Sequence, residues 1–293
     1  MDAPGRIVPR PGPDVISVIV PVRNGEPWLV GQLRSLVDQD YDGAWEVVVA
    51  DNGSTDQSRA VAAAWSERHP HIRCIDAAGA HGAPGARNAA VRLARGELLA
   101  FCDSDDEVGP GWLTACSAAL RDADVVAGVF DFWSLNGQPA SPPVPASMGQ
   151  LPFLPAGLGA NLAVRRQAFD AVGGFAEDLV TGEDVDLCWR LQIAGYRFAV
   201  AEAAVVAKRD RVGFTDVFRQ GFAFGLGGPV LYRRHRPFGA RRNLGGAARS
   251  WLWLVLRSPG LVGAGSLRSQ WARAAGMRTG RLVGSARERV FFP

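Results

Sequence analysis

The sequence predicts an α/β protein with a mostly parallel central sheet and helices on both of its faces. Up to about residue 130, short apolar runs that suit buried strands alternate with segments of helical periodicity, a pattern typical of repeated βα units. Polar residues gather just after these apolar runs, and in such sheets the carboxyl ends of the strands bind ligands. The 293 residues suffice for one large domain with an appendage.

The first repeat sets the pattern for the others. Residues 16–22 form an apolar run that indicates a buried strand, and residues 27–39 place their leucines at helical spacing. By the same criteria we expect further strands over residues 46–50, 72–75, 98–102 and 125–130, and further helices over residues 56–68, 85–95 and 110–121.

The pattern changes after residue 130. Residues 132–164 carry no charge and contain six prolines, so they cannot form a spanning helix and we expect a long loop. Helices are expected over residues 166–172 and 183–194, with a Gly-Gly pair between them that breaks the first helix. Residues 197–206 are strand-like.

By composition the chain divides into three parts. Residues 1–14 contain four prolines and no apolar core, so we expect a tail that is not a secretory signal. Residues 15–207 form the main α/β domain, with a net charge of −11 together with the tail. Residues 208–293 hold 17 Lys and Arg against three Asp and Glu, a net charge of +14. Such asymmetry indicates a polyanionic partner for this extension, or simply a solvated basic face.

The basic extension also carries short apolar segments in which Trp and Phe stand beside Arg. These segments are too short to span a bilayer, and their composition is typical of helices that lie in a membrane interface. The alternative is that the aromatic side chains pack on the main domain. The four cysteines are widely spaced without a C-x-x-C pair, and the four histidines show no metal-ligand spacing. This spacing argues against a zinc site or disulfide framework and favours a reducing, cytoplasmic compartment.

An acidic turn, Asp103-Ser104-Asp105-Asp106, follows the strand expected over residues 98–102. Carboxylates crowded at a strand end repel one another, and a divalent cation bound to substrate phosphates would relieve that repulsion. Mg²⁺ typically binds through one or two carboxylates together with phosphate oxygens. From these residues alone, an acidic turn in which Asp106 caps the next helix is an equally open interpretation.

Five blocks in this order carry a family resemblance: residues 17–26 (SVIVPVRNGE), 48–56 (VVADNGSTD), 85–90 (GARNAA), 101–106 (FCDSDD) and 182–190 (GEDVDLCWR). Together they resemble the family 2 glycosyltransferases over about residues 15–207. The resemblance implies the GT-A fold, an inverting reaction, and a catalytic domain over residues 15–207 followed by a basic helical extension.

The resemblance also implies a donor site for a nucleoside diphosphate sugar. Asp105 and Asp103 would ligate Mg²⁺ or Mn²⁺, with Asp103 also near the ribose. The other expected nucleotide-sugar contacts are Pro21, Arg23, Asp51, Asn52, Arg87 and Arg209. For Asp51 the alternative is a cap on the following helix. Arg23 stands where many relatives have Tyr, which leaves the base open among UDP-, GDP- and dTDP-sugars.

The catalytic base implied by the resemblance is Asp184, which would take the proton of an acceptor hydroxyl on the face opposite the leaving group. Glu183 would orient the acceptor or tune Asp184, because neighbouring carboxylates shift each other's pKa. The alternative is an acidic first turn that stabilises the helix dipole.

The predicted function is metal-dependent, inverting sugar transfer to a saccharide or lipid-linked hydroxyl acceptor, in cell-envelope polysaccharide or glycolipid synthesis. We expect the enzyme on the inner face of the cytoplasmic membrane, held peripherally to an anionic surface, with no nucleic-acid partner. One rival is a sugar nucleotidyltransferase, but residues 23–27 are too short and acidic for its glycine-rich loop. The other is a non-enzymatic polyanion-binding protein, which would explain neither the aromatic clusters nor the five blocks.

Overall fold

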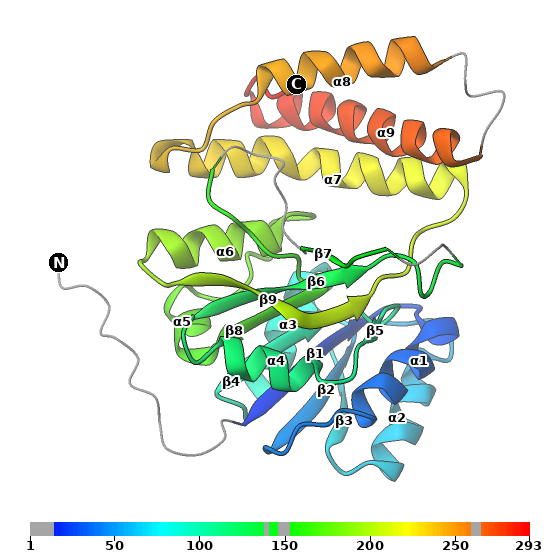
Figure 1. Cartoon of the computed structure of the whole chain (residues 1–293), viewed down its shortest axis with the longest axis vertical. Coiled ribbons are helices and arrows are strands. Elements are labelled where there is room, and N and C mark those ends of the chain that lie inside the picture. The colour runs from blue at the N-terminus through cyan, green and yellow to red at the C-terminus, as the bar shows by residue number, and fades with distance from the viewer. Residues whose placement is uncertain (1–14, 138–140, 146–152, 259–264) are drawn as a thin grey trace. The chain divides into compact units, whose positions relative to one another are not determined.

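The computed structural model describes residues 15–137, 141–145, 153–258 and 265–293 (Figure 1). The chain forms two compact units. The described part of the first comprises residues 15–137, 141–145, 155–177 and 184–210. The described part of the second comprises residues 153–154, 178–183, 211–258 and 265–293.

The first unit is built on one mixed β-sheet. Its strands lie in the order β3-β2-β1-β4-β8-β6-β9-β5, and β7 pairs with β6. Strands β1, β2, β3 and β4 pair in parallel, as do β6 and β9, while β8, β5 and β7 pair antiparallel to their neighbours. The strands span Ile16–Val22 (β1), Trp45–Asp51 (β2), Ile72–Asp76 (β3), Leu98–Cys102 (β4), Glu107–Val108 (β5), Val125–Asp131 (β6), Val144–Pro145 (β7), Asn161–Arg165 (β8) and Phe198–Ala207 (β9). The predicted α/β class with a mostly parallel sheet is therefore confirmed.

The central strands are apolar throughout because both faces of the sheet are covered. All five residues of β4 are buried. Ala100 and Cys102 face the core that helices α1, α2 and α4 complete, whereas the Phe101 ring packs against Phe169 and Phe175. Alternate side chains of a strand point to opposite faces, so a continuous apolar run is what a doubly covered strand requires.

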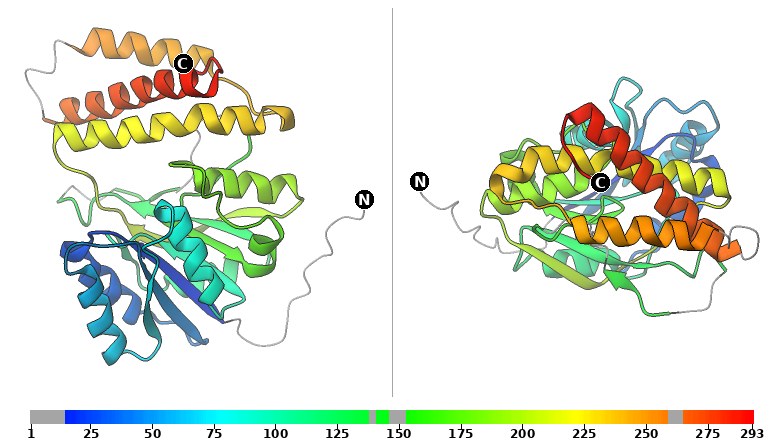
Figure 2. Two further views of the ribbon diagram at one scale, coloured as in Figure 1. Left: turned by 180° about the vertical axis from the view of Figure 1, so that it is seen from behind. Right: turned by 90° about the horizontal axis from the view of Figure 1, so that it is seen from above.

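The helices of the first unit connect successive strands (Figure 2). They span Glu26–Val37 (α1), Ser58–Arg68 (α2), Gly82–Leu93 (α3), Trp112–Ala119 (α4), Arg166–Ala171 (α5) and Glu183–Ile193 (α6). From β1 the chain runs outward through β2 and β3, and α3 then returns it to β4 on the other side of β1. The strand order reverses at that point, and an open parallel sheet binds ligands in the crevice formed there.

The long loop expected over residues 132–164 is wrong at two places, where the described residues form strands. Residues 161–165 form β8, which lies between β4 and β6 in the middle of the sheet, and residues 144–145 form the short β7. A five-residue strand preceded by prolines and glycines gives little periodicity. A buried polar side chain, Asn161, holds β8 in place. Its side-chain amide donates to the carbonyl oxygens of Val129 and Ala204 and accepts from Trp112 Nε1, at 2.9 Å each. Residues 138–140 and 146–152 lie outside the described residues.

The second unit contains three long helices, α7 (Phe214–His235), α8 (Leu244–Arg257) and α9 (Gly265–Glu288), and a short 3₁₀ helix, η1 (Arg236–Phe238). Helix α9 packs against both α7 and α8 (Figures 1 and 2). Glycines allow α7 and α9 to approach backbone to backbone: a Cβ added at Gly276 or Gly280 would lie 2.2 or 2.1 Å from the carbonyl oxygen of Phe218 or Phe222. Within the described residues, no helix has the length and apolar content needed to cross a bilayer.

Candidate active site

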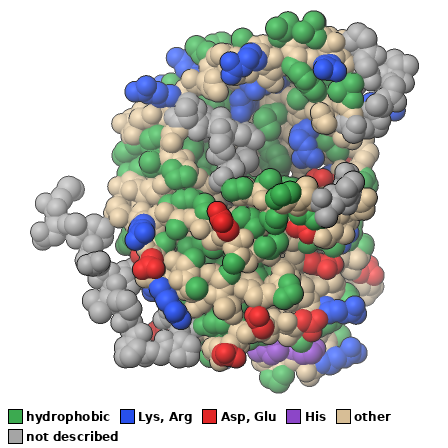
Figure 3. All heavy atoms as spheres, in the orientation of Figure 1, with side chains coloured by type: hydrophobic (Ala, Val, Ile, Leu, Met, Phe, Trp, Pro, Cys, Tyr) green, Lys and Arg blue, Asp and Glu red, His purple; other side chains and the backbone are tan. Residues whose placement is uncertain are grey.

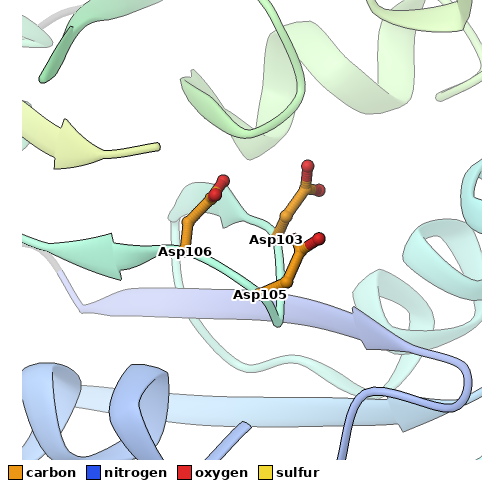
Figure 4. Close-up of side chains that lie close together, drawn as sticks. All are labelled: Asp103, Asp105 and Asp106. Carbon is orange, nitrogen blue, oxygen red and sulfur yellow. The ribbon is translucent and has the colours of Figure 1, made fainter. Parts of the chain in front are cut away.

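The acidic turn that the sequence singled out follows β4 at the carboxyl edge of the sheet. Asp103, Asp105 and Asp106 each place a carboxylate oxygen within 4.8 Å of the others, and the three side chains rise from the turn toward one side (Figure 4). The turn is held from below by Gln32 of α1, whose buried amide donates to the Asp103 carbonyl at 2.8 Å and accepts from the Val108 amide at 3.2 Å. The acidic cluster therefore has a fixed backbone.

Cationic side chains surround two of the three carboxylates. Lys208 Nζ lies 2.7 Å from Asp106 Oδ2 and 3.2 Å from Asp103 Oδ2. Arg87 Nη2 lies 2.8 Å from Asp103 Oδ1. The Arg209 amide donates to Asp106 Oδ1 at 2.9 Å. Both carboxylate oxygens of Asp103 and of Asp106 thus accept charge-assisted or backbone hydrogen bonds, which are among the stronger ones in proteins.

The pKa values of Asp106 and Asp103 are shifted in opposite directions. Burial raises the pKa of Asp106 to about 7, with the nearby Asp103 and Asp105 adding to the effect and Lys208 opposing it. Burial also acts to raise the pKa of Asp103, but Lys208 and Arg87 outweigh it and hold that pKa below its ordinary value. Asp106 does not cap the following helix: the residue at the start of α4 is Gly111, and the carboxylate of Asp106 is committed to Lys208 and Arg209 instead.

Lys208 is a further residue of the site, and the sequence pattern alone does not place it at the acidic turn. It is the only lysine of the 293 residues, against 31 arginines. It directly follows β9 and its ammonium group lies between two carboxylates. Their charges raise the pKa of Lys208 against the opposing effect of burial, so it stays a cation. A lone lysine in an arginine-rich chain was a detectable signal, because a compact ammonium fits where a planar guanidinium does not.

Asp184 reaches the same region from the start of α6. Its carboxylate accepts from the amides of Gly159 at 2.9 Å and of Val185 at 2.8 Å. Gly159 in turn lies on the Arg87 guanidinium: a Cβ there would stand 3.1 Å from Arg87 Cζ. Arg87 therefore contacts Asp103 on one side and the loop that holds Asp184 on the other. Burial raises the pKa of Asp184, and the charge of Asp103 adds to the effect. Glu183 is the first residue of α6.

The residues expected around the nucleobase lie at the ends of β1 and β2. Pro21 is buried within β1 and Arg23 is exposed just beyond it. Asp51 ends β2 with its side chain buried and accepts from the Ser54 amide at 3.2 Å. Asn52 is also buried, and its backbone amide donates to the Val22 carbonyl at 2.8 Å. The turn after β2 is thus linked to the end of β1.

The start of α2 is held by Asp56. Asp56 accepts from the Ser58 amide at 3.0 Å and from the Glu26 amide at 3.1 Å. It therefore joins the first turns of α1 and α2. Asp51 does not cap α2, because its side chain accepts from the Ser54 amide in the turn before that helix.

Arg209 lies beside the acidic turn rather than apart from it. Its Nε donates to the Asp105 carbonyl at 3.0 Å, and its Nη2 lies 3.8 Å from Glu107 Oε1. Backbone and side chain of Arg209 together clamp residues 105–107. Lys208 and Arg209 therefore bring the end of β9 to the end of β4, two elements separated by about a hundred residues.

The donor set at the turn suits a hard divalent cation. Clustered carboxylate oxygens match the ligands that Mg²⁺ and Mn²⁺ prefer, and the cluster would gain from positive charge beyond that of Lys208 and Arg87. The oxygens of Asp103 and Asp106 are shared with cationic and amide groups, so a bound cation would share them with these contacts. Asp103 can contribute through a second lone pair.

Comparison with known proteins identifies the family. The profile described as Glycosyl transferase family 2 matches residues 17–173, and that described as Glycosyl transferase family group 2 matches residues 101–273. The chain therefore belongs to glycosyltransferase family 2, and the family expected from the five sequence blocks is confirmed.

Individual relatives agree with this assignment. The chain is 31% identical over 280 residues to the pre-mycofactocin glycosyltransferase of Mycobacterium tuberculosis, covering 85% of this chain and 55% of that protein. It thus spans only about half the length of this relative. It is 27% identical over 220 residues to the glycosyltransferase AglE of Haloferax volcanii, covering 72% of each chain.

Solved structures confirm the GT-A fold. The mannosyltransferase PcManGT of Pyrobaculum calidifontis, in complex with GDP-mannose and Mn²⁺, superimposes with a TM-score of 0.66 at 19% identity, covering 96% of this chain and 89% of that one. TarS of Staphylococcus aureus with UDP-GlcNAc gives a TM-score of 0.54 at 22% identity over 95% and 93% of the two chains.

Proposed function

We propose that this chain transfers a sugar from a nucleoside diphosphate sugar to a hydroxyl acceptor with inversion at the anomeric carbon, assisted by Mg²⁺ or Mn²⁺. The observation that carries the proposal is the continuous contact from the acidic turn through Arg87 and Gly159 to Asp184. This contact brings the acidic turn, which we propose binds the diphosphate, and Asp184, which we propose is the base, into one site. The complexes of related folds with GDP-mannose and Mn²⁺, and with UDP-GlcNAc, support a donor of this class.

In this mechanism the turns after β1 and β2 bind the nucleoside. Asp51 accepts a hydrogen bond from the base or ribose, with Asn52, Pro21 and Arg23 around it. The buried polar groups of such a pocket reject analogues that leave them unpaired. Asp103 faces the ribose and the cation, and Arg87 fixes its orientation through the 2.8 Å ion pair.

The diphosphate occupies the side of the acidic turn toward which the three carboxylates rise. Asp105 and Asp103 hold the divalent cation, which when bound supplies Lewis acidity and offsets the negative charge that develops on the departing diphosphate. Lys208 and Arg209 add fixed positive charge at the end of β9. Pre-aligned charge of this kind lowers the barrier without reorganisation during the reaction.

Asp184 removes the proton of the attacking hydroxyl. Its raised pKa favours this role, since a stronger base accepts a proton more readily. The Gly159 and Val185 amides keep the carboxylate oriented. Glu183 orients the acceptor, which we propose to be a saccharide or lipid-linked alcohol of the cell envelope.

The test is nucleoside diphosphate release from UDP-, GDP- and dTDP-sugars in the presence of Mn²⁺ with saccharide and lipid-linked acceptors. Asp184→Asn should bind donor normally but lose turnover by about 10²–10⁴-fold. Asp122→Asn, an exposed aspartate beyond α4, is the matched control and should keep full activity. Unchanged turnover in Asp184→Asn removes the assigned base. Pyrophosphate release from a nucleoside triphosphate and a sugar phosphate would instead identify a nucleotidyltransferase.

A further inference from the structure

Helix α8 in the second unit has two faces of different character. Its buried residues Ala247 and Leu254 lie against α9. Trp271 Nε1 donates to the Leu254 carbonyl at 3.0 Å, and Arg278 Nε donates to Ser250 Oγ at 2.9 Å. Residues 247, 250 and 254 recur at the spacing of one helix face, so this face is the one that α9 covers.

The opposite face of α8 is apolar and exposed. Leu252, Val255 and Leu256 are 58%, 67% and 66% exposed, respectively. Their i, i+3, i+4 spacing puts them side by side on one surface of the helix. Exposed contiguous aliphatic groups are uncommon on soluble monomers and mark an interaction site. The exposed Arg249 lies on the same side of the helix, and Arg257 ends it.

The charge around this face has a single sign. Between residues 217 and 287 the sequence contains 13 arginines and no Asp or Glu. On the face seen in Figure 3, the charged side chains visible over α7, α8 and α9 are mostly basic, with hydrophobic ones between them. The two acidic groups that flank this stretch in sequence are already paired: Glu288 lies 2.9 Å from Arg233 and Asp216 lies 3.7 Å from Arg219.

We propose that the outward face of α8, formed by Leu252, Val255 and Leu256 with Arg249, docks onto an anionic lipid bilayer. Aliphatic side chains that enter the acyl boundary while arginines bind headgroup phosphates are the arrangement of an interfacial helix. A second copy of the same face is disfavoured, because a symmetric contact would set arginines against arginines with no acid to compensate. A nucleic acid would satisfy the arginines but leave the aliphatic groups without a partner.

Binding to vesicles of phosphatidylcholine with and without phosphatidylglycerol tests this, using the full chain without donor or metal. The wild type should float with the anionic vesicles, and added salt should weaken binding. Leu252→Gln with Leu256→Gln should weaken it by at least about tenfold. Arg249→Gln should weaken it by about fivefold. Val180→Gln, at an 81% exposed site in the segment that precedes α6, is the matched control and should leave binding unchanged.

Three results would overturn the proposal. The first is equal binding of the wild type and of the double Leu variant to anionic vesicles. The second is binding to short duplex DNA in place of vesicles, measured by fluorescence anisotropy. The third is a dimer in sedimentation that the double Leu variant abolishes. Because the substituted side chains are exposed, thermal unfolding should show each variant folded, and nucleoside diphosphate release should be unaffected in solution. Failure here is therefore distinct from failure of the proposed sugar transfer.

Discussion

Removing Lys208 should destabilise the first unit through the acidic turn. In Lys208→Met the fully buried Asp106 loses its 2.7 Å ion pair and keeps the Arg209 amide as a donor. Breaking a buried ion pair by removing one partner costs about 3–5 kcal/mol. The Lys208 side chain is 22% exposed, so water replaces part of the interaction and we expect the lower end, about 3 kcal/mol.

The double variant Lys208→Met with Asp106→Asn provides the sharper test. It removes both charges, so it should be less destabilised than the sum of the two single variants by at least about 1 kcal/mol. Urea unfolding followed by tryptophan fluorescence measures all three. Arg59→Met is the matched control, because its 3.0 Å pair with Asp76 joins side chains that are 60% and 53% exposed, and it should leave the urea midpoint nearly unchanged.

Additive effects of the two single changes, or a wild-type midpoint for Lys208→Met, would refute this reasoning. The sequence offers a second readout, since Lys208 is the only lysine. Acetylation of amines followed by peptide mapping should modify Lys208 slowly in the wild type. It should modify Lys208 faster in Asp106→Asn, where one of its two carboxylate partners is gone.

Three further predictions concern other parts of the molecule. Burial acts to raise the pKa of Glu46, but hydrogen bonds from Arg95, Ser17 and Arg73 hold that pKa below its ordinary value of 4.5. The contribution of Glu46 to the free energy of unfolding is therefore present above pH 4.5 and is lost as the pH falls through the lower folded pKa. Glu46→Gln should consequently lose less stability than the wild type on acidification below about pH 5. Gly280→Ala puts a Cβ 2.1 Å from the Phe222 carbonyl and should lower the melting temperature by an amount equivalent to about 1–3 kcal/mol, whereas Gly245→Ala in α8, with no atom within 4 Å, should be neutral or stabilising. Asp184 has a pKa raised above 3.8 by burial, so turnover should fall as pH drops through that raised value, and a pH-rate profile whose acid limb stays at 3.8 would argue against Asp184 as the base.

The sequence was sufficient for those parts of the fold that depend on local pattern. The apolar run of β4 and the leucines of α1 predict their elements because each strand or helix buries one fixed set of positions. It was insufficient for β8, whose place in the sheet depends on the buried Asn161 and its bonds to β6 and β9. Those bonds join residues 32 and 43 positions apart, and no short window of sequence contains them.

The candidate site divides in the same way. Carboxylates concentrated after a strand predict the acidic turn, and the structure brings Asp103, Asp105 and Asp106 together as expected. Their partners come from distant segments: Gln32 from α1, Arg87 from α3 and Lys208 from the end of β9. Which basic residue would reach the turn could not be derived from spacing, because the fold and not the sequence distance sets that contact.

The central claim is that the acidic turn binds a divalent cation together with a nucleoside diphosphate. The most direct measurement is free Mn²⁺ by electron paramagnetic resonance, titrated with protein in the presence and absence of UDP, GDP and dTDP. One of these diphosphates should tighten Mn²⁺ binding to the wild type, and Asp105→Asn should lose that enhancement while Asp122→Asn keeps it. Equal Mn²⁺ binding by the wild type and Asp105→Asn with every diphosphate would contradict the claim.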